Sequence, residues 1–420
     1  MRAWVIKTGE PVPHLLAESK DRLFRAGLMS QALQAHGMEV TWWSTQFHHQ
    51  LKIMRDVVPS VPCKPDQNGP EMIFLPSKGY KRHISPARFV DHVQVRRAFE
   101  RLAPNQPRPD VIICAWPTID LAFAAVKFGR AHNIPVILDI RDLWPDIFYE
   151  RITAKTGLPF KGYMIPYERM GRKAMCDADA VISITQGMLE WGQKRFARET
   201  TLEDRVFYQS QSAASATEDM AFWQDKDIDL DVLKTRLIWA GSLVSDLDAQ
   251  TLLAAIESLP ETASRELEFV FCGSGDLAPK VEEMAARLPH VAFAGWVGQD
   301  ALNALYARSH IGMMCYLDRF DFQLSIPNKV ADFTRSNMRI LTNLTGEMQR
   351  VLGPDDLLIP YPTGNVDALR DRLIEIADHP EKYRVQAPNA RALFDRLFDA
   401  DLVMPEFAHY VEQIAIRGHT

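Results

Sequence analysis

Short apolar runs alternate with helical patterns along the whole chain, and this alternation limits the possible folds most strongly. The runs lack a polar face, so each fits a strand that is buried on both sides. In the first half, such runs start at Trp4, Val40, Met72, Val111, Val136 and Ala180. In the second half, they start at Leu237, Leu267, Val291, Ile311, Arg339 and Leu357. Apolar strands separated by helices predict two successive α/β domains, each with a doubly wound parallel sheet.

The expected domain boundaries follow from a pause in this alternation. Residues 209–234 are rich in Ser, Ala, Thr and Asp and have no clear period, so we expect a linker there. An N-terminal domain is expected over 1–208 and a C-terminal domain over 235–404. The last segment, 405–420, has apolar residues on one helical face, and Pro405 suits a helix start. We expect this helix to return to the first domain.

Composition excludes several classes of protein. The chain has 420 residues, of which 47% are hydrophobic and 24% charged, as in globular proteins. A net charge of −6 argues against general nucleic-acid binding. The five cysteines form no CxxC pair, and the adjacent His48 and His49 have no third ligand nearby. These patterns predict free thiols in a reducing compartment and no zinc site. No run approaches the ~18 apolar residues of a membrane span, so we expect a cytoplasmic protein.

Function is expected in the loops that follow the strands, because open parallel sheets bind ligands beyond the carboxyl ends of their strands. Two such sheets facing each other would form a cleft. The loop over residues 7–14 contains Gly9 and precedes a helix, which favours an anion, although an ordinary turn is the alternative. The loop that begins at Asp139 places Arg141 and Asp142 after an apolar strand. Charge is costly there unless it is paired or functional, so a structural ion pair is the alternative.

The second half offers three further loops. Residues 240–243 and 272–276 contain glycines that would let backbone amides face a phosphate. Residues 325–333 continue into a helix on which Lys329 and Asp332 share a face. A lysine there can meet a diphosphate, and a carboxylate can accept both hydroxyls of a ribose. An exposed Lys–Asp pair on a surface helix is the alternative.

A basic segment with interleaved apolar side chains runs from Lys78 to Arg101. Basic residues outnumber acidic ones in it, although the whole chain is acidic. A basic, partly apolar helix is typical of binding to an anionic membrane surface. A solvated surface helix is the alternative.

Five motifs resemble, in order and spacing, those of a branch of family 4 glycosyltransferases from bacterial surface-polysaccharide pathways. They are Asp139-Ile-Arg-Asp-Leu-Trp-Pro145, Trp239-Ala-Gly-Ser-Leu243, Phe271-Cys-Gly-Ser-Gly-Asp276, Val291-Ala-Phe-Ala-Gly-Trp296 and Ile326-Pro-Asn-Lys-Val-Ala-Asp-Phe333. The resemblance covers nearly the whole chain. It implies the GT-B architecture, in which two Rossmann-like domains face a cleft that holds the active site. It also implies retaining transfer from a nucleoside-diphosphate sugar without a bound metal ion.

The loops and the resemblance together give three groups of candidate residues. The donor would be bound in the second domain by Gly241, Ser242, Gly273, Trp296, Val297, Ser325, Asn328, Lys329, Asp332 and Arg339. The acceptor would be bound in the first domain by Gly9, Glu10, His14, Arg22 and Arg25. Catalysis would involve Arg141, Asp142 and Lys329, through electrostatics and positioning. No metal ligand and no cofactor is expected, and a UDP-sugar is the favoured co-substrate.

The implied activity is transfer to a growing, lipid-linked acceptor of a capsule, lipopolysaccharide or exopolysaccharide, at the inner face of the cell membrane. The chain departs from the family pattern, because Ser242 and Leu247 are uncharged where relatives carry Arg and Lys. Asp332 stands in place of a glutamate, and Arg339 replaces a proline and would restore one cationic charge. Two other interpretations are a catalytically degenerate homologue that acts as a partner subunit, and a nucleotide-sugar epimerase on the same fold.

Overall fold

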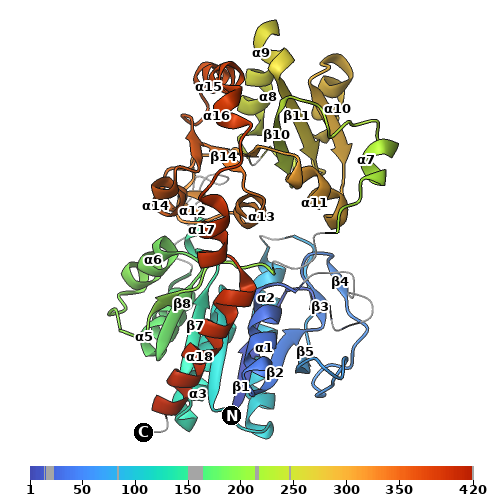
Figure 1. Ribbon diagram of the computed structural model, residues 1–420. Helices are drawn as coiled ribbons and strands as arrows, with labels where there is room; N and C mark the ends of the chain where they lie inside the picture. Colours follow the sequence, from blue (N-terminus) through green and yellow to red (C-terminus); the bar gives the residue numbers. More distant parts are fainter. Residues whose placement is uncertain are drawn as a thin grey trace. The chain divides into compact units, whose positions relative to one another are not determined.

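The computed structural model describes residues 1–13, 15, 23–82, 85–149, 164–212, 217–245 and 247–418 (Figure 1). The chain divides into two compact units. Unit 1 comprises Met1–Ser210 and Ala400–Thr420, and unit 2 comprises Gln211–Asp399. Each unit is an α/β domain built on a parallel sheet, which confirms the predicted fold class.

The sheet of unit 1 has seven described strands in the order β5-β2-β1-β6-β7-β8-β9, and all neighbouring strands pair in parallel. The strands are β1 (Arg2–Ile6), β2 (Glu39–Thr45), β5 (Glu71–Leu75), β6 (Val111–Trp116), β7 (Val136–Ile140), β8 (Ala180–Ser183) and β9 (Arg205–Val206). A short antiparallel pair, β3 (Phe47–His48) and β4 (Ile53–Met54), follows β2.

Helices cover both faces of this sheet, and therefore its strands read as continuous apolar runs. They are α1 (Arg25–Ala35), α2 (Pro86–Leu102), α3 (Ile119–His132), α5 (Ile165–Asp177), α6 (Gln186–Phe196) and α18 (Ala400–Arg417), with a 3-10 turn, η2 (Ala103–Asn105). Ala3 and Val5 of β1 belong to the cluster that α1 and α18 cover. Trp4, between them, faces the other side and stacks on Phe128 of α3. Ser85 caps α2 by accepting a hydrogen bond from the backbone N–H of Arg88.

Unit 2 repeats the architecture with six described strands in the order β12-β11-β10-β13-β14-β15. The strands are β10 (Thr235–Ala240), β11 (Leu267–Cys272), β12 (Val291–Gly295), β13 (Ile311–Met314), β14 (Arg339–Thr342) and β15 (Leu358–Pro360). The helices are α7 (Ala221–Asp225), α8 (Ala249–Glu257), α9 (Glu261–Glu266), α10 (Ala278–Arg287), α11 (Gln299–Ala307), α12 (Phe320–Gln323), α13 (Lys329–Arg335), α14 (Glu347–Leu352), α15 (Val366–Asp378), α16 (Pro380–Tyr383) and α17 (Ala390–Leu397), with a 3-10 turn, η4 (Gly353–Asp355). The core lies between the sheet and helices such as α8 and α15.

Two boundaries differ from those expected from the sequence. Most of the segment 209–234 belongs to unit 2, because α7 buries Trp223 and the indole N–H donates to the carbonyl of Ala301 at 2.8 Å. The last helix begins at Ala400, and Pro405 lies inside it. Burial of Val403 and Met404 stabilises the turn that precedes the proline, and Asp401 in that first turn is a residue type that favours a helix start.

Candidate functional site

The strand order of each sheet marks where a ligand would bind. Consecutive strands run outward from β1 through β2 to β5, and then the chain crosses over to β6 on the other side of β1. In unit 2 the same reversal lies between β10 and β13. In doubly wound sheets the loops at the carboxyl ends diverge at this point and leave a crevice. Each unit has a cavity lined by such loops.

The unit 1 pocket has a volume of about 200 Å³. Its walls come from the loops after β1, β6 and β7, and from α2 and the segment before it. The lining residues are Lys7, Thr8, Gly9, Thr45, Phe47, His49, Tyr80, Arg88, Asp91, His92, Val95, Pro117, Thr118, Arg141 and Asp142. Charged and aromatic side chains are therefore concentrated at one end of an otherwise apolar sheet.

A buried ion network supports one wall of this pocket. Asp139, at the end of β7, is fully buried and accepts hydrogen bonds from Arg25 at 3.0 Å and from Arg141 at 2.5 Å. Arg141 also pairs with Glu10, which accepts from the backbone N–H of Ala26 in the first turn of α1. Burial alone would raise the pKa of Asp139, but the two guanidinium groups outweigh it and lower this pKa. The network ties β7 to α1 and to the loop after β1.

Aromatic and cationic groups form the opposite wall. The guanidinium of Arg88 lies 4.1 Å from the ring centroid of Trp144 and 5.3 Å from that of Tyr80. The Tyr80 hydroxyl and the Nδ1 of His49 are 2.5 Å apart. His92, one turn after Arg88 on α2, stacks on Trp144 with ring centroids 5.7 Å apart. Arg88 and His92 share a helix face because they are four residues apart.

Burial sets the charge states in this pocket. Burial, followed by the charges of Arg88 and His49, lowers the pKa of His92 to about 3, so its imidazole is neutral at physiological pH. The Nδ1 of His92 is buried and has no hydrogen-bond partner among the described residues. Burial and the charge of Arg141 lower the pKa of Lys7. The neutral imidazole of His92 and the amino group of Lys7 both line the pocket and are thus available to a ligand.

The structure divides the sequence-predicted residues of unit 1 into three groups. Gly9, Arg141 and Asp142 line the pocket. Glu10 and Arg25 belong to the buried network instead, and Arg25 also donates to the carbonyl of Phe207 at 2.7 Å. The prediction that Arg25 binds an acceptor is therefore not supported by its position. His14 and Arg22 lie outside the described residues.

Sequence reasoning missed several lining residues. From the sequence, His49 was considered only as a possible metal ligand beside His48. Tyr80 and Arg88 belong to the basic segment Lys78–Arg101, for which we expected membrane binding. His92 and Lys7 were not singled out. A usable signal was the four-residue spacing of Arg88 and His92, on a helix that follows the carboxyl end of β5.

The unit 2 pocket has a volume of about 260 Å³ and lies at the carboxyl ends of β10, β11 and β12. Its lining residues are Ala240, Gly241, Ser242, Cys272, Gly273, Ser274, Trp296, Val297, Leu302 and Lys329. Within this set Lys329 alone has a charged side chain. Five of the predicted donor residues are thus brought together with Lys329: Gly241, Ser242, Gly273, Trp296 and Val297.

Glycine is required where the loops of this pocket touch. The backbone N–H of Gly241 donates to the carbonyl of Cys272, and that of Gly273 donates to the carbonyl of Gly295. Gly273 has φ +144°, and a Cβ atom there would lie 1.8 Å from the backbone oxygen of Gly241. A side chain would separate the loops, so the pocket depends on glycine at this position.

Lys329 and Asp332, which the sequence places on one helix face, form an ion pair with each other. The Nζ of Lys329 donates to Oδ2 of Asp332 at 3.0 Å and lies 3.2 Å from the hydroxyl of Tyr306. Asp332 is 1% exposed, and its buried Oδ1 has no hydrogen-bond partner among the described residues, although the guanidinium of Arg335 lies 3.8 Å away. Lys329 reaches the pocket, whereas Asp332 stands behind it and orients the ammonium group.

Four predicted donor residues do not line this pocket, and Asp332, which lies behind Lys329, is one of them. Arg339 starts β14, at the amino edge of the sheet, and donates to the carbonyl of Val385. The helix α13 carries the chain from the carboxyl edge to the amino edge, so a residue after it lies away from the pocket. Ser325 donates to the carbonyl of Phe322, and the backbone oxygen of Asn328 accepts from Gln211.

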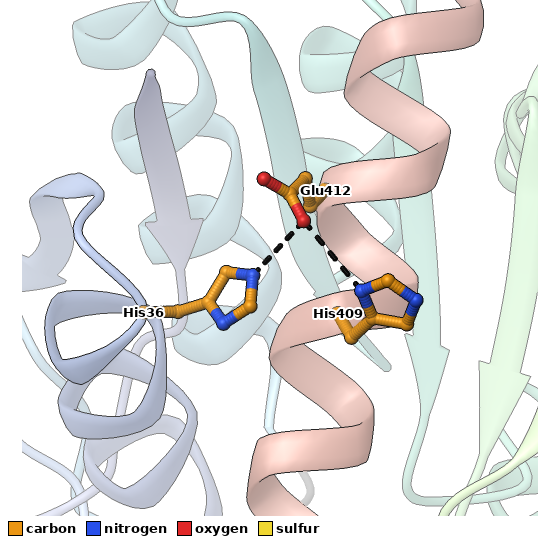
Figure 2. A group of neighbouring side chains, drawn as sticks. All are labelled: His36, His409 and Glu412. Carbon is orange, nitrogen blue, oxygen red and sulfur yellow. Dashed lines mark hydrogen bonds and ion pairs between the residues drawn. The ribbon is translucent and has the colours of Figure 1, made fainter.

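Among the residues that the structure describes, one group could hold a metal ion. His36, His409 and Glu412 bring their ligand atoms within 4.8 Å of one another on the surface of unit 1 (Figure 2). Among the helices described, none has the length and apolarity of a membrane span.

Two family models match the chain, one in each unit. A glycosyl transferase 4-like domain matches residues 25–202, and a glycosyl transferases group 1 domain matches residues 234–379. No curated protein shows a significant sequence match.

Solved structures share the fold over nearly their whole length. Sucrose-phosphate synthase from Thermosynechococcus elongatus has a TM-score of 0.68 at 12% identity, with 99% of each chain covered. HepE from Anabaena in complex with UDP has a TM-score of 0.65 at 11% identity, covering 98% of this chain and 99% of that one. WaaG, a glycosyltransferase involved in lipopolysaccharide biosynthesis, has a TM-score of 0.57 at 13% identity, with 99% of each chain covered. At such identities the likeness is one of fold.

The two domain matches, in their order along the chain, agree with two doubly wound units and with a pocket at the switch point of each. The chain belongs to the family 4 glycosyltransferases of the GT-B class.

Proposed function

We propose that this glycosyltransferase binds a nucleoside-diphosphate sugar, with UDP-sugars favoured, in the unit 2 pocket. The observation that carries the proposal is the combination of Lys329 with two close glycine loops and an exposed aromatic ring. The indole of Trp296 is 77% exposed at the pocket, which is unusual for a tryptophan unless a ligand covers it. A base stacked on Trp296 would direct its diphosphate toward Gly241, Gly273 and Lys329. The complex of HepE with UDP, a protein of similar fold, supports uridine as the favoured base.

The pocket also supports a role for Lys329 in leaving-group stabilisation. Breaking the bond between sugar and diphosphate places negative charge on the departing diphosphate. Asp332 and Tyr306 hold the ammonium group of Lys329 in place before a ligand arrives, and such preorganised charge favours the transition state. In this proposal the lysine and the backbone amides supply the positive charge, the transfer needs no metal ion, and the anomeric configuration is retained.

The unit 1 pocket is the proposed acceptor site. A neutral His92 can exchange hydrogen bonds with a sugar hydroxyl, and Tyr80 and Phe47 offer aromatic faces beside it. Asp142 and Arg141 close the pocket at the end of β7. We assign Arg141 a positioning role, because its guanidinium is held by Asp139 and Glu10.

The outer face of α2 supports a membrane-bound acceptor. A groove of about 790 Å³ on this helix is lined by Lys78, Phe89, Val90, Val93, Gln94, Arg97, Glu100 and Arg101. Apolar side chains flanked by cations match the acyl boundary and anionic headgroups of a lipid surface. We therefore propose a lipid-linked acceptor of a bacterial surface polysaccharide and peripheral attachment at the inner face of the cell membrane. Vesicle flotation tests this part: anionic vesicles should bind the wild type and release the Arg97→Glu/Arg101→Glu variant.

Calorimetric titration with UDP, GDP, ADP and TDP, in the presence of EDTA, tests the donor assignment. One diphosphate should bind more tightly than the others, and EDTA should not abolish its binding. Binding of none would favour the degenerate partner subunit. Incubation with the matching nucleotide sugar alone separates the remaining alternative, since an epimerase would convert the sugar without an acceptor.

A further inference from the structure

His36, His409 and Glu412 converge on one point of the unit 1 surface from two helices (Figure 2). His36 is the C-terminal cap of α1, and His409 and Glu412 lie about one turn apart on α18. The Nε2 of His36 is 3.0 Å from Oε2 of Glu412, and the Nδ1 of His409 is 3.5 Å from the same oxygen. Both imidazoles therefore direct a ring nitrogen at one carboxylate oxygen.

These separations fit the edges of a tetrahedral zinc site. Bonds of about 2.0–2.2 Å from zinc to nitrogen or oxygen place neighbouring ligand atoms about 3.3–3.6 Å apart. The observed 3.5 Å lies within this range, and the observed 3.0 Å is a few tenths of an ångström shorter. Two imidazoles and one carboxylate form a ligand set preferred by zinc and similar transition metals, whereas magnesium and calcium prefer oxygen ligands alone. Water would complete the coordination.

The surroundings leave the three side chains open to a cation. No lysine or arginine among the described residues pairs with Glu412. The amide nitrogen of Gln413 lies 3.0 Å from the Nε2 of His409, so the Nδ1 of His409 is the ring nitrogen that faces Glu412. The three side chains are partly exposed, so an ion in solution can reach them.

We propose that His36, His409 and Glu412 bind a divalent transition-metal ion of the zinc class, which fastens α18 to the end of α1. The chain returns to unit 1 at Ala400 after passing through unit 2, so α18 is held on the rest of unit 1 by non-covalent contacts. A metal bridge to His36 would stabilise this attachment. The site lies where α1 ends and β2 begins, at the opposite edge of the sheet from the unit 1 pocket, and it requires no part of the proposed donor chemistry.

Calorimetric titration of the EDTA-stripped full chain with Zn²⁺ tests the proposal. The wild type should bind Zn²⁺ and not Mg²⁺, and Glu412→Gln and His409→Ala should each weaken Zn²⁺ binding by at least about tenfold. His379→Ala is the matched control, because His379 and Glu381 are 3.2 Å apart in an exposed pair that lacks a third ligand. This variant should retain the wild-type affinity. A Cys176→Ser background removes the exposed thiol as a competing ligand.

Thermal melting separates this site from a site elsewhere. Zn²⁺ should raise the Tm of the wild type and of His379→Ala, and should leave that of His409→Ala unchanged. Zinc affinity that is the same in wild type, His409→Ala and Glu412→Gln would overturn the proposal, as would an absence of zinc binding. UDP binding is measured on the same samples, so a failure of the donor assignment is distinguishable from a failure of the metal site.

Discussion

Replacing Lys329 by alanine is the most direct test of the donor site. The side chain of Lys329 is 29% exposed, and its ammonium group lies at the unit 2 pocket. Among the described residues that line this pocket, Lys329 alone has a charged side chain. A hydrogen bond to a charged group contributes about 1.5–3 kcal/mol. Since about 1.4 kcal/mol corresponds to a tenfold change in affinity, Lys329→Ala should raise the Kd for UDP by about 10- to 150-fold.

Two controls make this result specific. Lys329→Ala also leaves the buried Asp332 without its closest cation, which lowers stability. The double variant Lys329→Met/Asp332→Asn removes both charges and separates lost binding from lost folding, which thermal melting reports. Arg339→Ala tests the sequence-based alternative, because Arg339 was expected to bind the donor and lies at the opposite edge of the sheet.

Calorimetric titration with UDP, in EDTA and at two salt concentrations, is the assay. The Kd should rise steeply in both Lys329 variants and remain at the wild-type value in Arg339→Ala. The wild-type Kd should also increase with salt, since ionic attraction is screened. A folded Lys329→Ala protein that binds UDP as tightly as the wild type would refute the assignment, as would a loss of binding in Arg339→Ala.

Three further predictions follow from the two pockets. Trp296→Ala should weaken UDP binding by the stacking contribution of about 1–3 kcal/mol, measured by calorimetry, and leave the Tm unchanged because the ring is exposed. Asp139→Asn should lower the free energy of unfolding by about 3–5 kcal/mol in guanidinium denaturation, because Arg25 and Arg141 lose their shared counter-charge. Since the pKa of Asp139 is lowered in the fold, its contribution is present at neutral pH and is lost as acid protonates the carboxylate. The pKa of His92 is lowered to about 3 in the fold, whereas it is about 6.5 in the unfolded chain, so the unfolded chain binds a proton more readily between these values. The free energy of unfolding should therefore decrease as the pH drops from about 6.5 to about 3. His92→Gln should reduce this dependence on pH, which denaturation at several pH values measures.

The sequence predicted the sheets well because period and burial act locally. Each apolar run required a strand covered on both faces, and the runs that start at Trp4, Val111 and Leu237 became β1, β6 and β10. The unit 2 pocket was also largely predictable. Its glycines lie in loops directly after strands, where chain position and spatial position coincide, and Lys329 is the first residue of α13.

The boundaries and the unit 1 pocket were harder to predict because they depend on contacts between distant segments. The local sequence of residues 209–234 has the composition of a linker, and only the contact of Trp223 with Ala301 shows that the segment packs against unit 2. Arg25 resembles a solvated helix residue until Asp139, 114 residues later in the chain, lies beside it. Arg88 carries the same charge as its neighbours in a basic segment, and its aromatic contacts alone set it apart.

The two pockets occupy equivalent edges of equivalent sheets, yet their linings differ in a way that supports a division of labour. The unit 2 pocket is mostly backbone, with one described cationic side chain, and close backbone approach suits a phosphate group that carries its own charge. The unit 1 pocket combines aromatic rings, a neutral imidazole and paired charges, which suits a neutral polyol that must be oriented by many weak bonds. A diphosphate placed in the unit 1 pocket would meet Asp91 and Asp142 as well as its cations, whereas the described lining of the unit 2 pocket contains Lys329 and no carboxylate. In the proposed function, the fold therefore provides one pocket at the carboxyl edge of each sheet, and the side chains at those edges would determine which ligand each pocket accepts.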